Sequence, residues 1–274
     1  MSEIGNNLKR ARLIKNMSLR EVGYNLNISA TAVSKYEKGI IMPDSKRLIE
    51  FANLYQVKVR DLLQSKKLPK MSFNSFRKKK SLTGKRLEIL KNIILNRVRD
   101  YLEVLNLTQY NPIKLTKFKC NSIEDAEAIA KKYRKIINIS AIQPISDLIS
   151  ILENLGIMII QIVDVNNYIK DFDGLSEIVD DIPFIVLLDN IKDGARQRFT
   201  IAHELGHLVM DIADELDAEK MCHRFASAFL MPRESIINEF GNFRKNISLF
   251  ELKTFKEEYK VSYAAIIYRL KDLN

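Results

Sequence analysis

The chemically most informative stretch of this 274-residue chain holds two histidines four residues apart, His203 and His207, with Glu204 beside the first. Residues four apart lie on one face of an α-helix, so both imidazoles can reach a single ion. Zn²⁺ fits this pattern, because neutral imidazole binds it and a catalytic zinc site needs only three protein ligands. We therefore predict a zinc site in which Glu204 takes a proton from the attacking water and later passes it to the leaving amine.

The histidine content favours a metal site over a chance match. The chain has only three histidines, and all of them lie between positions 203 and 223. The motif also falls in a helical stretch that follows predicted strands, which is the context that the chemistry requires.

The third ligand must come from another segment, and residues 218–226 are the obvious source. A helix there could fold back on the first and bring Glu219 to the ion. His223 lies four residues on and shares that face, so two assignments stay open. Either Glu219 binds zinc while His223 supports a ligand histidine or the transition state, or His223 binds zinc directly. Cys222 is a third possibility, although its side chain should point about 100° away from that of His223.

Two separated segments resemble the ImmA/IrrE family of metallopeptidases. The first runs from Arg198 to Leu208 around the histidine pair, and the second runs from Glu219 through Cys222-His223-Arg224-Phe225-Ala226 to Pro232. The family is similar to thermolysin-type zinc enzymes, so the resemblance implies a zincin-like α+β fold and zinc endopeptidase activity. It also implies a narrow protein substrate, such as a repressor or an antitoxin-like protein. The implied ligands are His203, His207 and Glu219, with Glu204 as general base and His223 in a supporting catalytic role.

The first 65 residues are predicted to form five short helices, with Ser18 and Ser29 at N-cap positions. The second and third have the layout of a helix-turn-helix, whose later helix presents small polar residues to base edges and lysines to phosphates. The stretch around Ser34-x-Tyr36-Glu37-x-Gly39 resembles Cro/repressor-like (XRE-type) domains. The predicted DNA-contacting residues are Ser29, Thr31, Ala32, Ser34, Lys35 and Lys38. The alternative is a protein-binding or dimerising module.

The charge is distributed unevenly along the chain. Residues 1–65 carry 11 Lys/Arg against 6 Asp/Glu, residues 66–120 carry 15 against 3, and residues 121–274 carry 18 against 25. Opposite net charges predict different partners for the two halves, and the basic half suits a polyanion. The basic run Arg77–Lys80 either adds sequence-independent contacts to DNA phosphates or is a solvated linker.

The pattern along the chain predicts three regions and a multi-domain fold. Residues 1–65 form an all-α helix-turn-helix domain, 66–120 form a basic linker and connector helix, and 121–274 form an α+β metallopeptidase domain with a small sheet. Strands are expected at 157–163, 175–179 and 183–188, and residues 106–120 are expected to be irregular. The strand at 183–188 could be an edge strand that pairs with substrate or a core strand.

These features predict a DNA-binding transcriptional regulator with zinc-dependent endopeptidase activity. The alternative is a regulator or antitoxin-like protein whose zinc domain senses or binds a partner without cleaving it. Two distant cysteines give no disulfide framework, and the N-terminus lacks a signal-peptide apolar core, so we expect a cytoplasmic protein without a membrane partner. Repressor-like domains often bind two half-sites, so a homodimer is also expected.

Overall fold

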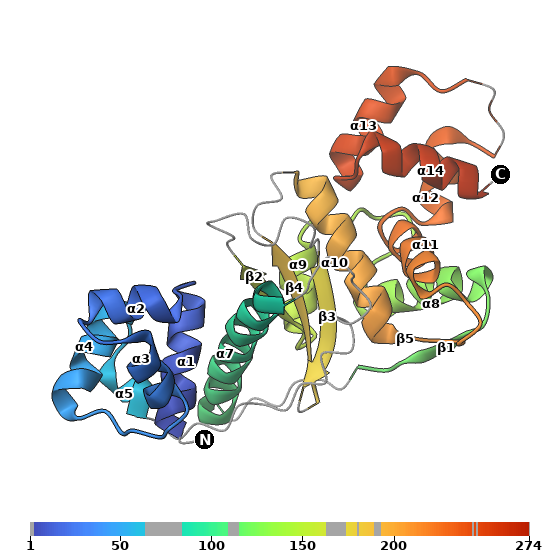
Figure 1. Cartoon of the computed structure of the whole chain (residues 1–274). Coiled ribbons are helices and arrows are strands. Elements are labelled where there is room, and N and C mark those ends of the chain that lie inside the picture. The colour runs from blue at the N-terminus through green and yellow to red at the C-terminus, as the bar shows by residue number, and fades with distance from the viewer. Residues whose placement is uncertain are drawn as a thin grey trace. The chain divides into compact units, whose positions relative to one another are not determined.

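The computed structural model describes residues 3–63, 84–108, 115–162, 174–179, 181–188, 193–242, 244 and 246–273. The described residues form two compact units, one up to residue 108 and one from residue 115 onward (Figure 1). The predicted basic linker, including Arg77–Lys80, lies outside the described residues. Each unit has its own hydrophobic core.

Five helices build the first part of the N-terminal unit, as the sequence predicts. They are α1 (Glu3–Ile14), α2 (Leu19–Asn25), α3 (Ala30–Glu37), α4 (Ser45–Tyr55) and α5 (Val59–Leu63). Side-chain caps begin three of them: Ser18 for α2, Ser29 for α3 and Asp44 for α4 each accept a bond from the backbone of the first turn. Fully buried Leu8, Val22 and Phe51 hold the helices together.

A buried ion pair crosses this core. Arg12 Nε and Nη2 donate to the two carboxylate oxygens of Glu37 over 2.6 and 2.9 Å. The two residues are only 7% and 6% exposed, and Arg12 also donates to the carbonyl of Met17. Glu37, in the stretch that resembles XRE-type domains, therefore ties α3 to α1 instead of facing outward.

The helix α7 (Gly84–Thr108) packs with this unit. Lys9 on α1 pairs with Glu88 at 2.8 Å, and Leu90, Ile94 and Val98 are buried. The sequence places this helix in a connector between domains. In the structure it contacts α1 and belongs to the N-terminal unit.

Two small sheets lie in the C-terminal unit. The larger has the order β2-β4-β3, from β2 (Met158–Ile162), β3 (Gly174–Val179) and β4 (Ile182–Leu188). β4 is buried at every position and pairs with β2 in parallel and β3 in antiparallel. It is thus a core strand, and the edge-strand interpretation is wrong.

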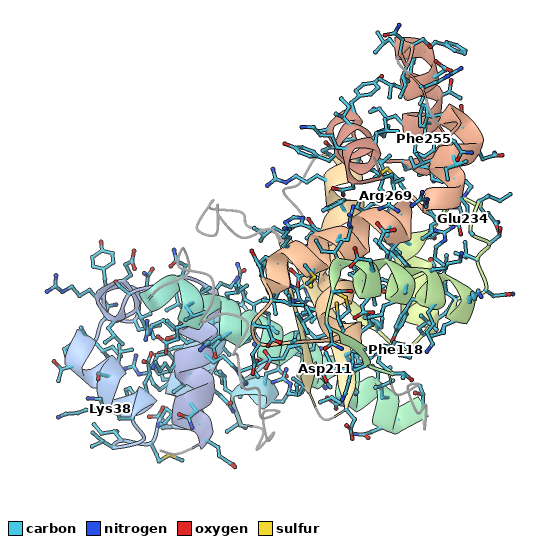
Figure 2. All side chains as sticks on the ribbon, turned by 90° about the vertical axis from the view of Figure 1, so that its right-hand side faces the viewer. Lys38, Phe118, Asp211, Glu234, Phe255 and Arg269 are labelled. Atoms are coloured by element: carbon cyan, nitrogen blue, oxygen red, sulfur yellow. The ribbon has the colours of Figure 1, made fainter. Side chains whose placement is uncertain are left out.

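The second sheet contains two strands that the sequence did not reveal. β1 (Phe118–Cys120) pairs in parallel with β5 (Met210–Ile212), opposing Lys119 to Asp211. Figure 2 labels Phe118 and Asp211 on these neighbouring strands. Three-residue strands are too short to show an alternating pattern, and their partners are distant in sequence. The prediction that residues 118–120 are irregular is therefore wrong.

The other elements of this unit are helical. They are α8 (Ile123–Ile136), α9 (Leu148–Asn154), α10 (Gly194–Val209), α11 (Ala218–Leu230), α12 (Arg233–Phe240), α13 (Leu249–Tyr259) and α14 (Tyr263–Leu273). Proline favours the first turn of a helix, but α9 does not begin at Pro144. It begins at Leu148, because Asp147 caps it by accepting the backbone N–H of Ser150.

Two buried arginines fasten the helices. Arg134 on α8 donates to the carbonyls of Ser140, Gln143 and Phe229. Arg269 on α14, labelled in Figure 2, is fully buried and donates to both Glu127 oxygens and to the carbonyl of Met231. Buried guanidinium groups need such partners, because leaving a charge unsatisfied in the interior is costly.

The predicted fold class is confirmed: an all-α helix-turn-helix unit and an α+β unit with small sheets. Among the described residues, no helix combines the length and apolarity needed to cross a membrane.

Candidate metal centre and nucleic-acid interface

Helix α10 carries the histidine pair on its buried side. Asp193 caps the helix by accepting the backbone N–H of Ala195, and the helix runs unbroken to Val209. His203 is 8% exposed and the neighbouring Glu204 only 4%. The ring centroids of His203 and His207 lie 5.0 Å apart, so the four-residue spacing puts both imidazoles on one face of the helix, as expected.

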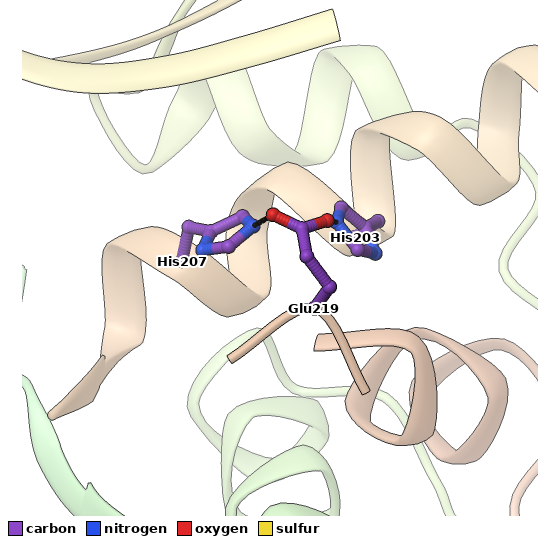
Figure 3. Close-up of side chains that lie close together, drawn as sticks. All are labelled: His203, His207 and Glu219. Atoms are coloured by element: carbon purple, nitrogen blue, oxygen red, sulfur yellow. Dashed lines mark hydrogen bonds and ion pairs between the residues drawn. The ribbon is translucent and has the colours of Figure 1, made fainter. Parts of the chain in front are cut away.

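Helix α11 brings the third side chain. Asp217 accepts backbone bonds from Glu219 at 3.0 Å and Lys220 at 3.2 Å, which fixes Glu219 in the first turn. The carboxylate then reaches back to α10, where Oε2 lies 3.1 Å from His203 Nε2 and Oε1 lies 3.5 Å from His207 Nε2. Figure 3 shows this bridge between the two helices.

Close packing of the two helices depends on Gly206, inside the histidine motif. A Cβ there would lie 3.2 Å from the Phe225 ring and 3.4 Å from Cys222 Cα. The missing side chain lets α11 approach α10 closely, and that approach brings Glu219 within reach of both imidazoles.

The three side chains are suited to a zinc ion. Their ligand atoms all lie within 4.8 Å of one another. The carboxylate of Glu219 spans the two imidazoles, with one oxygen 3.1 Å from His203 Nε2 and the other 3.5 Å from His207 Nε2. Two imidazoles and one carboxylate are a usual protein ligand set for a catalytic zinc ion. Hydrogen bonds from His203 and His207 hold the pKa of Glu219 well below its usual range, so the carboxylate is ionised as a ligand should be.

His223 lies beside the set of three without joining it. Its ring centroid is 4.5 Å from that of His203, and it stacks on Phe199 at 5.7 Å. Burial, and next the neighbouring His203, lower the pKa of His223. Cys222, the third candidate from the sequence, is fully buried in the core.

Ser176 is a neighbour of Glu204 that the sequence did not single out. It lies on β3, and its hydroxyl donates to Glu204 Oε2 over 2.8 Å in a buried setting. The strand comes very close at Gly174, where a Cβ would lie 2.6 Å from Thr200 and 3.2 Å from the Glu204 side chain. No motif marks Ser176, because only the folded sheet brings it to α10.

His203 Nδ1 is buried and has no hydrogen-bond partner among the described residues. Metal-ligating histidines usually donate this second N–H to a carbonyl, a carboxylate or water. A buried water is one group that would satisfy it.

The residues predicted to contact DNA lie on α3 and at its two ends. Thr31, Lys35 and Lys38 are exposed, while Ala32 and Ser34 are partly exposed. Figure 2 shows Lys38 at the outer edge of its unit. Val33 is fully buried, which turns the opposite face of α3 into the core. The exposed Ser29 hydroxyl accepts the backbone N–H of Ala32, so this side chain already serves as the helix cap.

Comparison with known families agrees with this division of the chain. Residues 8–62 match a family model described as helix-turn-helix. Residues 152–271 match a peptidase family model described as IrrE N-terminal-like domain. Comparison with curated proteins gave no match.

Proposed function

We propose that this chain, which joins an XRE-type helix-turn-helix domain to an IrrE-like domain, is a DNA-binding regulator that is also a zinc-dependent endopeptidase. Its substrate would be one specific protein, such as a repressor or an antitoxin-like protein. The observation that carries the proposal is the position of Glu204. Glu204 directly follows His203 on α10 without belonging to the set of three side chains proposed to bind the metal, and Ser176 donates a hydrogen bond to its carboxylate.

The residues divide the work of peptide hydrolysis. His203, His207 and Glu219 would hold Zn²⁺, which when bound supplies a Lewis acid for the substrate carbonyl and the attacking water. Glu204 would take the proton from the water and pass it to the leaving nitrogen. Hydrogen bonding from Ser176 limits the carboxylate to one orientation, so less reorganisation is needed when the proton moves.

His223 would support the transition state from the edge of the site. Its ring contacts His203 and Phe199, which fixes its position. From there an N–H of the imidazole would be able to stabilise negative charge as it develops on the substrate oxygen.

The N-terminal unit would bring this activity to DNA. Thr31, Ala32, Ser34 and Lys35 are proposed to face the major groove, with Ser29 and Lys38 contacting its edge and the phosphates. Because repressor-like domains commonly bind paired half-sites, we propose that a homodimer binds the operator.

The test uses Glu204→Gln, which keeps the shape of the side chain and removes its basicity. Candidate substrates are proteins that copurify with the chain or are encoded beside it. Cleavage should fall by about 10²–10⁴ in the variant, the usual contribution of a general base. Zinc content should stay unchanged, because Glu204 is outside the set of three. The exposed Glu215→Gln serves as the matched control.

An uncleaved partner that copurifies in stoichiometric amount with both wild type and Glu204→Gln would contradict the peptidase. It would favour a regulator whose metal domain binds a partner without cutting it.

A further inference from the structure

A cavity of about 620 Å³ lies in the C-terminal unit next to His223, the neighbour of the proposed metal ligand His203. Helix α10 lines it with Ala195 and Phe199, and α11 lines it with His223. Ala265 and Tyr268 line it from α14. Its volume falls within the roughly 300–1,000 Å³ that is usual for ligand sites.

His223 connects the cavity to the metal centre. The ring lines the cavity, stacks on Phe199 and has its centroid 4.5 Å from that of His203. A group that fills the cavity is therefore separated from a proposed metal ligand by one imidazole. A peptide whose carbonyl lies at the metal would have the side chain of an adjacent residue within reach of the opening.

The lining favours an apolar occupant. Val261, at 1% exposure, and Phe199 present hydrocarbon. Among the charged residues of the lining, Arg224 pairs with Asp272 at 2.7 Å and Asp193 caps α10. The other two, Arg196 and Lys220, are exposed to water. A charged group buried there would lose its hydration without gaining a dedicated partner, whereas an apolar group would lose only its contact with water.

The α14 wall is held rigidly. Arg269 is fully buried on this helix and bonds to both oxygens of Glu127 on α8 and to the carbonyl of Met231 after α11. These three bonds link α14 to α8 and to the end of α11. The cavity is therefore preformed, and the small side chain of Ala265 leaves room inside it.

We propose that this cavity binds the bulky apolar side chain of a substrate residue next to the cleaved bond, and that α14 sets the size it accepts. The proposal rests on the peptidase function proposed above. An aromatic or branched aliphatic side chain matches the lining, and Ala265 is the specificity-determining position on α14.

The first experiment measures binding alone, with N-acetyl-phenylalaninamide and N-acetyl-alaninamide as probes in NMR titrations of the full chain. Wild type should bind the phenylalanine probe at least about tenfold more tightly, since each methylene in an apolar pocket discriminates by roughly 10-fold or more. Ala265→Leu narrows the cavity from the α14 side and should reduce that preference. Ala264→Leu, an identical change at the exposed neighbouring position, should retain it.

A second variant guards against misfolding of the first. Tyr268 is 68% exposed, so Tyr268→Ala removes part of the wall without disturbing the core. It should weaken binding of the phenylalanine probe several-fold. Equal binding of this probe by wild type, Ala265→Leu and Tyr268→Ala would overturn the assignment of the cavity.

The second experiment follows cleavage of a degenerate peptide mixture by mass spectrometry. Wild type should prefer bulky apolar residues at one position beside the cut, and Ala265→Leu should shift that preference toward alanine and serine by about tenfold. Cleavage without such a preference would overturn the cavity's role but keep the peptidase. Probe binding with no cleavage by wild type would overturn the peptidase and the subsite role together, leaving only an apolar binding cavity.

Discussion

The two units place their charged groups in opposite ways. In the N-terminal unit the buried ion pair between Arg12 and Glu37 is satisfied internally, and the proposed functional side chains, such as Lys35 and Lys38, are on the outside. In the C-terminal unit His203 and Glu204 are buried and His207 is partly buried, while Glu219 stays exposed, and these groups converge from two helices and a strand. A surface that reads DNA needs exposed side chains, whereas a catalytic site needs groups withdrawn from water.

The largest effect should come from removing one of the side chains that meet at the proposed metal site of the C-terminal unit. Loss of a residue that supports a metal ligand from outside the ligand set weakens metal binding by about 10–100-fold. His223→Ala should therefore weaken zinc binding by at most about that factor. Glu219→Ala removes a proposed ligand and should weaken zinc binding by well over roughly 100-fold. Chelator competition measures both values, with Glu215→Ala as the control. Zinc retained by Glu219→Ala and lost from His223→Ala would reverse the ligand assignment.

Breaking the internal ion pair should damage only the N-terminal unit. Arg12→Met leaves the Glu37 carboxylate buried without its partner, which should cost about 3–5 kcal/mol of that unit's stability. Hydrogen exchange followed by mass spectrometry locates the loss, and zinc binding should not change. The double variant Arg12→Met/Glu37→Leu should recover much of the stability, because neither charge is then left buried alone. Equal loss in the single and double variants would show that the charge pairing is not what matters.

The outward-facing character of α3 can be tested with charge. Lys35→Ala should weaken binding to a non-specific DNA duplex and lower the slope of log affinity against log salt by about 1, as expected for one lost phosphate contact. Fluorescence anisotropy across a salt series measures the slope. Lys15→Ala, an exposed lysine on another part of the unit, should leave the slope unchanged. Equal slopes for wild type and both variants would favour a protein-binding module.

The smallest effect concerns Ser29, where structure and DNA contact compete for one hydroxyl. Ser29→Ala should cost about 1 kcal/mol of stability through the lost cap. Ser29→Asp keeps the cap but adds a negative charge, so it should retain stability and weaken DNA binding. Thermal melts together with anisotropy separate the two roles. Unchanged DNA affinity in Ser29→Asp would remove Ser29 from the interface.

Helices were predictable because their signals are local. Ser18 and Ser29 cap the helices expected from the sequence. The strands β1 and β5 were missed, because pairing of three residues with three leaves almost no pattern in either segment. The sequence also leaves open whether β4 is a central or an edge strand, because a continuous apolar run fits both. The structure places it in the centre of the sheet.

The sequence by itself determined which reactive groups the helices carry and which of them share a helix face. Helical geometry obliges His203 and His207 to share a face, and the same spacing rule puts Thr31 and Lys35 on one side of α3. Only the tertiary structure decided which distant groups meet them. Glu219 reaches the histidines because Gly206 lets α11 come close, and Ser176 reaches Glu204 because Gly174 lets β3 come close. Such meetings depend on how elements pack, and packing between segments far apart in the chain leaves no local periodic signal.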